Sequence, residues 1–354
     1  MIQLPLGHVE IKTGDAPFPI PPRRRRFFFC IPQNQRHLSL LIHWSSLVSK
    51  SETPEFKQDF TTNYGVAEVL SPLITRVLCQ NPSPYTYTGT GTYIVGAGNN
   101  VAVIDPGPPM EAHGEALLRA IDGKTVSHIL VTHTHMDHSP LSTWLQEKTG
   151  APTYAFGAHG AGRKAGLDGE DVEAGADKSF EPDHLLKDGD VISGDGWTLA
   201  VLHTPGHTAN HVCFHLKEEN TLFVGDHIMG WATTVISPPD GDMTQYLQSL
   251  RKVVELAPDK LVPTHGPWVD NPNRFVRAII THRRMRENQI VRRLEKGPLT
   301  IDMMVADMYK DVDPRLHPAA ARSVLAHLIA LADSGQVDPG GAPNLGATWT
   351  LVQN

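Results

Sequence analysis

The chemistry of this chain is concentrated in one stretch, Val131-Thr132-His133-Thr134-His135-Met136-Asp137-His138. The apolar residues 129–131 are typical of a buried strand, so the polar residues stand where a strand ends and a loop begins. Such loops commonly carry catalytic groups in α/β proteins. His133 and His135 can face one point from an extended loop, while Asp137 and His138 enter the next turn and reach a second point. We interpret the stretch as a site for two metal ions; the alternative is a polar loop in a chain with 19 histidines.

Four further motifs carry side chains of the same kind. In chain order they are Val103-Ile104-Asp105-Pro106-Gly107, Thr204-Pro205-Gly206-His207-Thr208, Phe223-Val224-Gly225-Asp226 and Val262-Pro263-Thr264-His265-Gly266. Together with the histidine stretch they resemble the five signature motifs of the metallo-β-lactamase superfamily, in the same order. The resemblance covers about residues 70–267.

The resemblance implies a role for each of these residues. It implies that His133, His135 and His207 bind a first metal, that Asp137, His138 and His265 bind a second, and that Asp226 bridges the two. It also implies that Asp105 supports the histidine loop. Asp137 and Asp226 are the predicted catalytic residues. His211 flanks a ligand segment, and we expect it to orient a ligand, with a purely structural role as the alternative.

Strand-like and helix-like segments recur in both halves of the residues that carry the motifs. This pattern indicates an α/β fold with two facing sheets covered by helices, and the resemblance implies the same four-layer αββα sandwich. We predict a metallo-β-lactamase-fold catalytic domain over residues 51–270. Residues 271–354 are expected to form a linker helix and a small C-terminal winged-helix-like domain, which packs on the body, dimerises or binds nucleic acid.

Residues 1–50 differ from the rest of the chain. Their apolar residues recur with no consistent spacing, and four consecutive arginines stand at 23–26. The segment fits neither a signal peptide nor a transit peptide. We predict that they are a disordered extension, or that the start of the protein was assigned too early and they do not belong to it. The three cysteines are too scattered for a disulfide framework, which favours a reducing compartment. No apolar run approaches the ~20 residues of a membrane helix, so we expect a cytoplasmic protein.

Charge is unevenly distributed along the chain. The net charge is −7, but residues 51–273 carry 13 Lys/Arg against 28 Asp/Glu, whereas residues 1–50 carry seven against two and residues 274–354 carry 11 against eight. An acidic body argues against tight non-specific binding of nucleic acid, which needs a basic surface. Two divalent metals would reverse the potential locally, so the site itself can still hold an anion.

Imidazole and carboxylate ligands suit zinc, with iron or manganese as alternatives. Two zinc ions held ~3.5–4 Å apart by a carboxylate lower the pKa of a bridging water from ~15.7 towards ~7, so that hydroxide is available at neutral pH. The predicted enzyme is therefore a dinuclear zinc-dependent hydrolase. Its hydroxide attacks an electrophilic carbonyl or phosphoryl group, and the metals stabilise the charge that develops.

The predicted substrate pocket follows Asp226. Residues 228–234 are apolar with hydroxyl groups, and such a wall accepts a neutral organic group better than a phosphate backbone. The predicted substrate contacts on it are Met229, Trp231, Thr233 and Thr234. We therefore favour a small-molecule carbonyl substrate: an ester, a thioester or a lactone. Asp226 departs from true zinc β-lactamases, so lactam hydrolysis is expected to be weak.

Two other interpretations remain open. The pattern around His282-Arg283-x-x-Arg286 resembles the corresponding segment in the lactamase-β-like endoribonucleases, which form one branch of the superfamily. The metal ligands of this branch are similar to those of the glyoxalase II-like proteins. In that alternative the chain cleaves single-stranded RNA, and Arg283 and Arg286 guide the phosphates. In the third interpretation the chain is a nucleic-acid-binding or scaffold protein whose metals stabilise the fold. A homodimer is a further expectation.

Overall fold

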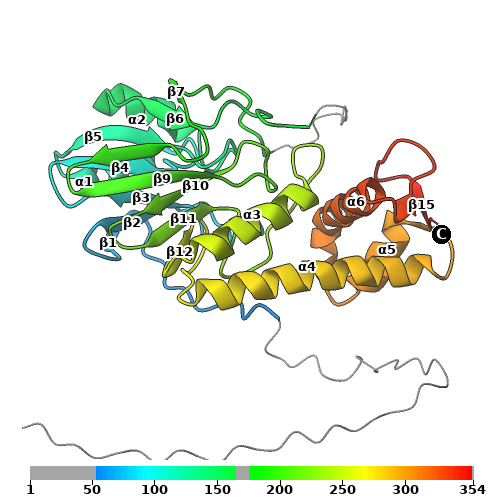
Figure 1. The fold of residues 1–354 in the computed structure, drawn as a ribbon. Helices are drawn as coiled ribbons and strands as arrows, with labels where there is room; N and C mark the ends of the chain where they lie inside the picture. Colours follow the sequence, from blue (N-terminus) through cyan, green and yellow to red (C-terminus); the bar gives the residue numbers. More distant parts are fainter. Residues whose placement is uncertain (1–52, 165–174, 353–354) are drawn as a thin grey trace, which may run out of the picture. The chain divides into compact units, whose positions relative to one another are not determined.

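We describe residues 53–164 and 175–352 in a computed structural model of the chain (Figure 1). The extension predicted over residues 1–50 lies outside the described residues. Within them, no helix combines the length and the apolar character needed to cross a membrane.

The first sheet has seven strands in sequential order. They are β1 (Ala67–Val69), β2 (Ile74–Leu78), β3 (Gly91–Val95), β4 (Asn100–Ile104), β5 (Thr125–Leu130), β6 (Thr153–Ala155) and β7 (His184–Leu185). Strands β1 to β4 pair antiparallel, and β4 to β7 pair parallel. Helix α1 (Glu111–Ile121) crosses from β4 to β5, and α2 (Leu141–Thr149) crosses from β5 to β6. The parallel pairing brings the carboxyl ends of β4 and β5 to the same edge of the sheet.

The second sheet has five strands in the order β12-β11-β10-β9-β8. They are β8 (Val191–Gly194), β9 (Trp197–His203), β10 (Val212–Leu216), β11 (Thr221–Gly225) and β12 (Lys260–Pro263). Helix α3 (Met243–Leu256) connects β11 to β12, and these two strands pair parallel. It begins where the Asp242 carboxylate accepts a hydrogen bond from Gln245 N, and it ends at Ala257, which has a left-handed φ of 50°. These two caps fix where the chain turns back towards β12.

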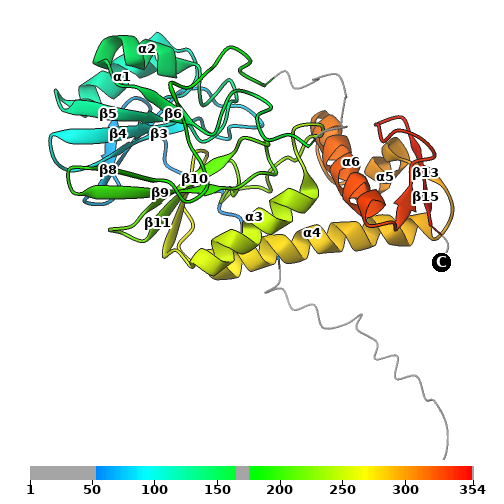
Figure 2. The same cartoon turned by 45° about the horizontal axis from the view of Figure 1, so that its top comes forward.

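Three apolar layers alternate with the two sheets. One layer lies between the sheets and includes Ile104 and Leu130 from the first sheet and Phe214 and Val262 from the second. The second layer lies between the first sheet and α1 with α2, and the third joins the second sheet to α3 and α4 (Pro272–Leu294). Figures 1 and 2 show the helices on the two outer sides of the paired sheets. The predicted α/β fold with an αββα sandwich is confirmed.

The C-terminal part forms its own core. After α4 come β13 (Leu299–Thr300), α5 (Ile301–Met308), a short 3-10 turn (Pro314–Leu316), α6 (His317–Asp333), β14 (Val337–Asp338) and β15 (Thr348–Leu351). The three strands pair in the order β13-β15-β14, and the buried Trp349 lies among residues of α4, α5 and α6. The predicted winged helix is confirmed. Ala326 of α6 also joins the apolar layer of α3 and α4, so the winged helix packs on the catalytic body.

Candidate metal centre

The predicted metal ligands meet at one edge of the sandwich, where strands of both sheets end. The histidine stretch follows β5, while His207, Asp226 and His265 follow β9, β11 and β12. The structure brings all seven side chains into three overlapping groups, within each of which the donor atoms lie within 4.8 Å of one another. The groups are His133, His135 and His207; His133, His138 and Asp226; and Asp137, His138 and His265.

Asp226 lies between the two outer groups. Its Oδ1 atom is 3.3 Å from His265 Nε2 and 3.7 Å from His138 Nε2. Its Oδ2 atom is 3.8 Å from His207 Nε2. A carboxylate whose two oxygens face different groups of histidines can contact two cations at once. This is the arrangement that a bridging ligand requires.

Several of these ligand atoms are buried and have no hydrogen-bond partner among the described residues. They are His138 Nε2, His265 Nε2 and Asp226 Oδ1. His265 Nε2 lies 3.1 Å from Asp137 Oδ2, which is an ion-pair distance without hydrogen-bond geometry. Leaving a buried polar group unpaired costs ~1–3 kcal/mol. Convergent imidazole nitrogens and carboxylate oxygens are a donor set that divalent metals such as zinc accept, so the residues fit such ions.

The histidines of the centre differ in charge. Burial and the neighbouring imidazoles of His138 and His135 hold the pKa of His133 well below its usual range, so that His133 is neutral. Burial also disfavours the charged form of His265, but the carboxylates of Asp226 and Asp137 outweigh it and raise the pKa of His265 to about 10. Without a metal, a protonated His265 therefore supplies positive charge that a cation would otherwise supply.

Metal binding should release protons. His265 is protonated at pH 7 because its pKa is about 10, whereas an imidazole must be neutral to bind a metal. We expect zinc binding at pH 7 to release about one proton or more per chain, and zinc affinity to rise as the pH rises above 7. Calorimetric titration of chelator-treated protein, in buffers of different ionisation enthalpy, measures the proton count. A binding enthalpy that is the same in all buffers would contradict this expectation.

Asp105 connects the histidine stretch to the segment that carries His265. Its buried carboxylate accepts hydrogen bonds from Thr132 N and Thr132 Oγ1, each at 2.8 Å, and from Thr264 Oγ1 at 2.9 Å. It also lies 2.9 Å from His138 Nδ1. Asp105 therefore fixes the orientation of one ligand and the spacing between the two sheets at the centre.

Other contacts orient the remaining ligands. His207 Nδ1 lies 2.7 Å from Val235 O, and His265 Nδ1 lies 3.1 Å from Gly89 O. His211 Nε2 accepts a hydrogen bond from Asp226 N at 3.3 Å. A Cβ atom on Gly225 would stand 2.6 Å from His211 Nε2, so only glycine allows this close approach.

The predicted pocket residues lie on the loop that follows β11. Thr234 is buried, and its hydroxyl donates to the carbonyl oxygens of Asp226 and His227 at 2.8 and 3.1 Å. Met229 is buried and Thr233 is half-buried. Trp231 is half-buried and stacks on Tyr87, with ring centroids 4.8 Å apart. Thr234 thus supports the backbone at the centre, while Trp231 packs on Tyr87.

The two arginines predicted to contact substrate have other partners. Arg283 is buried on α4 and donates to the carbonyl oxygen of Thr234, and its guanidinium lies 5.3 Å from the Tyr246 ring. Arg286 donates to Gln289 Oε1 at 2.9 Å and lies over the ring of Tyr309, in the winged helix. Arg283 therefore positions the pocket loop through Thr234, and the phosphate contacts predicted for both arginines stay predictions.

Arg283→Met should impair hydrolysis of a neutral substrate. The change removes the donor to Thr234, whose hydroxyl supports the carbonyl of Asp226. We expect kcat/KM to fall ~10–100-fold, as for other residues that orient metal ligands. Arg284→Met is the matched control, because Arg284 is the next residue on α4 and is exposed. Unchanged turnover of a neutral substrate, together with loss of RNA cleavage, would assign Arg283 to phosphate binding instead.

The sequence interpretation missed Tyr87 and Gln58. The Tyr87 hydroxyl donates to Gln58 O, and the Gln58 amide donates to Trp231 O at 3.0 Å. Tyr87 has a left-handed φ of 56°, which is uncommon for a bulky residue and often marks a functional position. Backbone strain leaves no pattern in a single sequence, so Tyr87 could be found only in the structure.

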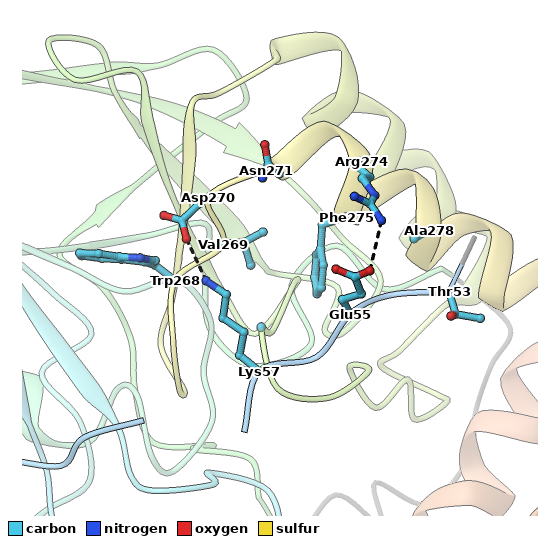
Figure 3. Close-up of a pocket in the computed structure, with 11 residues that line it drawn as sticks. Thr53, Glu55, Lys57, Trp268, Val269, Asp270, Asn271, Arg274, Phe275 and Ala278 are labelled. Atoms are coloured by element: carbon cyan, nitrogen blue, oxygen red, sulfur yellow. Dashed lines mark hydrogen bonds and ion pairs between the residues drawn. The ribbon is translucent and has the colours of Figure 1, made fainter. Parts of the chain in front are cut away.

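A separate cavity of about 200 Å³ lies between residues 53–57 and the beginning of α4 (Figure 3). Its walls include Phe275 and Val269, and two ion pairs join its sides: Lys57 with Asp270, and Glu55 with Arg274. None of its lining residues is a predicted metal ligand. The cavity is therefore distinct from the metal centre, and the ion pairs attach residues 53–57 to α4.

Comparison with known proteins agrees with this architecture. Residues 87–265 match the family described as metallo-beta-lactamase superfamily, and residues 300–349 match the beta-lactamase associated winged helix domain. The solved structure of a beta-lactamase domain protein from Burkholderia ambifaria covers 86% of this chain and 99% of its own, with a TM-score of 0.69 and 20% identity. It shares the fold.

Two relatives are similar in sequence. A "Beta-lactamase-like protein 2 homolog" of Caenorhabditis elegans is 32% identical over 279 residues, which are 77% of this chain and 88% of that protein. An "Atrochrysone carboxyl ACP thioesterase" of Aspergillus fumigatus is 33% identical over 234 residues, which are 64% and 67% of the two chains. These matches, with the family match over half of the sequence, show that the chain belongs to the metallo-β-lactamase superfamily and is a hydrolase.

Proposed function

We propose that the chain is a dinuclear zinc-dependent hydrolase of carbonyl substrates and that its preferred substrates are thioesters. The observation that carries the proposal is the Asp226 carboxylate, which stands between two groups of buried histidines. Its Oδ1 atom and the Nε2 atoms of His138 and His265 lack hydrogen bonds among the described residues. The thioesterase named among the relatives supports the choice of thioesters over other carbonyl compounds.

The side chains of the centre have different roles in the proposed hydrolysis. When bound, two zinc ions supply an activated water and polarise the carbonyl oxygen. Neutral His133 offers its imidazole to a cation, while Asp226 balances charge on both sides of the centre. The Asp137 side chain is 25% exposed, against 0% for His138 and His265. Asp137 therefore lies on the open side of the centre. Burial opposes the charged form of its carboxyl, but His138 and His265 outweigh burial and lower its pKa, so it faces an entering substrate as a carboxylate.

The wall of the centre favours an acyl group over a chain of phosphates. The Tyr87 and Trp231 rings lie beside Gly266, which follows His265, and the guanidinium of Arg283 is buried against Thr234. One observation supports the RNA alternative. Arg277, Arg284 and Arg292 are exposed on α4 and make no ion pair among the described residues. An assay must therefore include RNA.

The test is a substrate panel on zinc-loaded protein of known metal content. It contains an N-acetylcysteamine thioester, an oxygen ester with the same acyl group, a chromogenic β-lactam and labelled single-stranded RNA. We expect the highest kcat/KM on the thioester and weak turnover of the lactam. Cleavage of RNA without turnover of either acyl substrate would replace the proposal with the endoribonuclease function. Turnover that persists after removal of metal would refute the metal-dependent mechanism.

A further inference from the structure

An aromatic pair, Tyr87 and Trp231, lies beside the segment that carries the candidate ligand His265. The two rings are close to parallel, at 14°, with centroids 4.8 Å apart, and both residues are half-buried. A Cβ atom on Gly266 would stand 2.8 Å from Trp231 Cδ1 and 3.3 Å from Tyr87 Cδ1. Gly266 directly follows the ligand His265, so both rings lie against the backbone that carries this ligand.

Gln58 holds both rings from the side of the N-terminal segment. Its backbone oxygen accepts the hydrogen bond of the Tyr87 hydroxyl, and its side-chain amide donates to Trp231 O at 3.0 Å. Its neighbour Lys57 donates its backbone N–H to Gly230 O at 2.9 Å and pairs with Asp270 (Figure 3). This segment therefore acts as a strap that fixes the loop carrying Trp231.

Two observations argue against a role in packing alone. Tyr87 adopts a left-handed φ of 56°, which is uncommon for a bulky residue and marks a strained position. The indole N–H of Trp231 has no hydrogen-bond partner among the described residues, so the ring is not placed there for its polar group. Each ring turns one face to the other, so a ligand beside the segment of His265 would stack on an outer face.

We propose that Tyr87 and Trp231 form a subsite that selects planar acyl groups, and that Gln58 is the positioning residue of this subsite. The inference rests on the proposed thioester hydrolysis and deepens it by naming the acyl class. A flat unsaturated or aromatic group gains binding free energy by stacking on an aromatic face. A puckered saturated ring of the same size gains only the free energy of burying its apolar area. The subsite therefore discriminates by the shape and electrons of the acyl group rather than by its size.

The first test measures binding without hydrolysis. Two thioethers, S-benzyl-N-acetylcysteamine and S-(cyclohexylmethyl)-N-acetylcysteamine, have the same carbon skeleton and no scissile carbonyl. We expect the zinc-loaded protein to bind the benzyl compound about fivefold more tightly, a ratio typical of one stacking contact. Trp231→Leu should reduce this ratio to about one. Gln58→Ala should reduce it partly, while the exposed Gln336→Ala serves as the matched control.

The second test measures hydrolysis of phenylacetyl and cyclohexylacetyl thioesters, in which the carbonyl is not conjugated to the ring. We expect the wild type to prefer the phenylacetyl thioester through KM, and Tyr87→Phe to keep a preference that Trp231→Leu loses. If both thioesters are hydrolysed equally, or if Trp231→Leu keeps the preference, the subsite is refuted and the proposed function stands.

A different outcome would refute the proposed function but not the subsite. If the benzyl thioether binds preferentially while neither thioester is hydrolysed, the rings select a planar group in another reaction. If single-stranded RNA is cleaved and displaces the benzyl thioether, the rings stack on bases, and the inference of an acyl subsite is overturned.

Discussion

Asp226→Ala will leave a folded protein that binds at most one zinc ion and has lost most of its activity. The side chain faces both groups of histidines, so its removal takes a ligand from each metal position. We expect kcat/KM to fall more than ~100-fold, beyond the ~10–100-fold loss typical of residues that only orient ligands. The fold should persist, because Asp226 Oδ1 makes no hydrogen bond among the described residues.

The measurements are zinc content by elemental analysis, far-ultraviolet circular dichroism and thioester turnover. Asp195→Asn is the matched control, because Asp195 is an exposed carboxylate in the turn between β8 and β9. Two zinc ions per chain in the purified Asp226→Ala protein would rule out a bridging role for this carboxylate. One zinc or none in carefully loaded wild type would rule out the dinuclear centre itself.

Asp105→Ala will destabilise the whole catalytic domain as well as the metal centre. The carboxylate is buried and accepts three hydrogen bonds from Thr132 and Thr264, beside its contact with His138. Its removal leaves buried donors unpaired and His138 without a partner on Nδ1. Losing one member of a buried, charged network of this kind costs ~3–5 kcal/mol, so we expect a large loss of stability and of bound zinc together.

Denaturant unfolding of chelator-treated protein separates the two effects, because it removes the contribution of metal binding. Asp105→Asn is the graded control, since it keeps the shape and one acceptor oxygen but presents an amide to the remaining donors. It should fall between wild type and alanine. If the metal-free Asp105→Ala protein unfolds at the wild-type denaturant concentration, the hydrogen bonds of Asp105 do not hold the two sheets together.

The sequence predicted those parts of the molecule that depend on local pattern. Strand β11 is a near-continuous apolar run because both faces of its sheet are covered, and β5 ends in the buried pair Ile129 and Leu130. Polar residues that directly follow such runs must lie at a sheet edge. For this reason the positions of His133 and Asp226 at strand ends could be predicted, and the structure brings them together with the other predicted ligands.

What the sequence could not predict depends on contacts between distant segments. Gln58 and Trp231 meet across 173 positions, and residues 53–60 have no period that indicates a role. Arg283 belongs to a helix with many arginines, which resembles a surface for phosphates. Its burial follows from the way α4 packs against the loop that contains Thr234. No local sequence pattern indicates that packing.

The ligands are spread along the chain in a way that orders the assembly of the centre during synthesis. His133, His135 and His207 have all been made once translation is a little past the middle of the chain. The group of Asp137, His138 and His265 must wait for β12, which adds to the edge of the second sheet beside β11. We therefore expect a nascent chain to capture one ion first, and a singly loaded protein to be the intermediate through which the ribosome-bound chain matures.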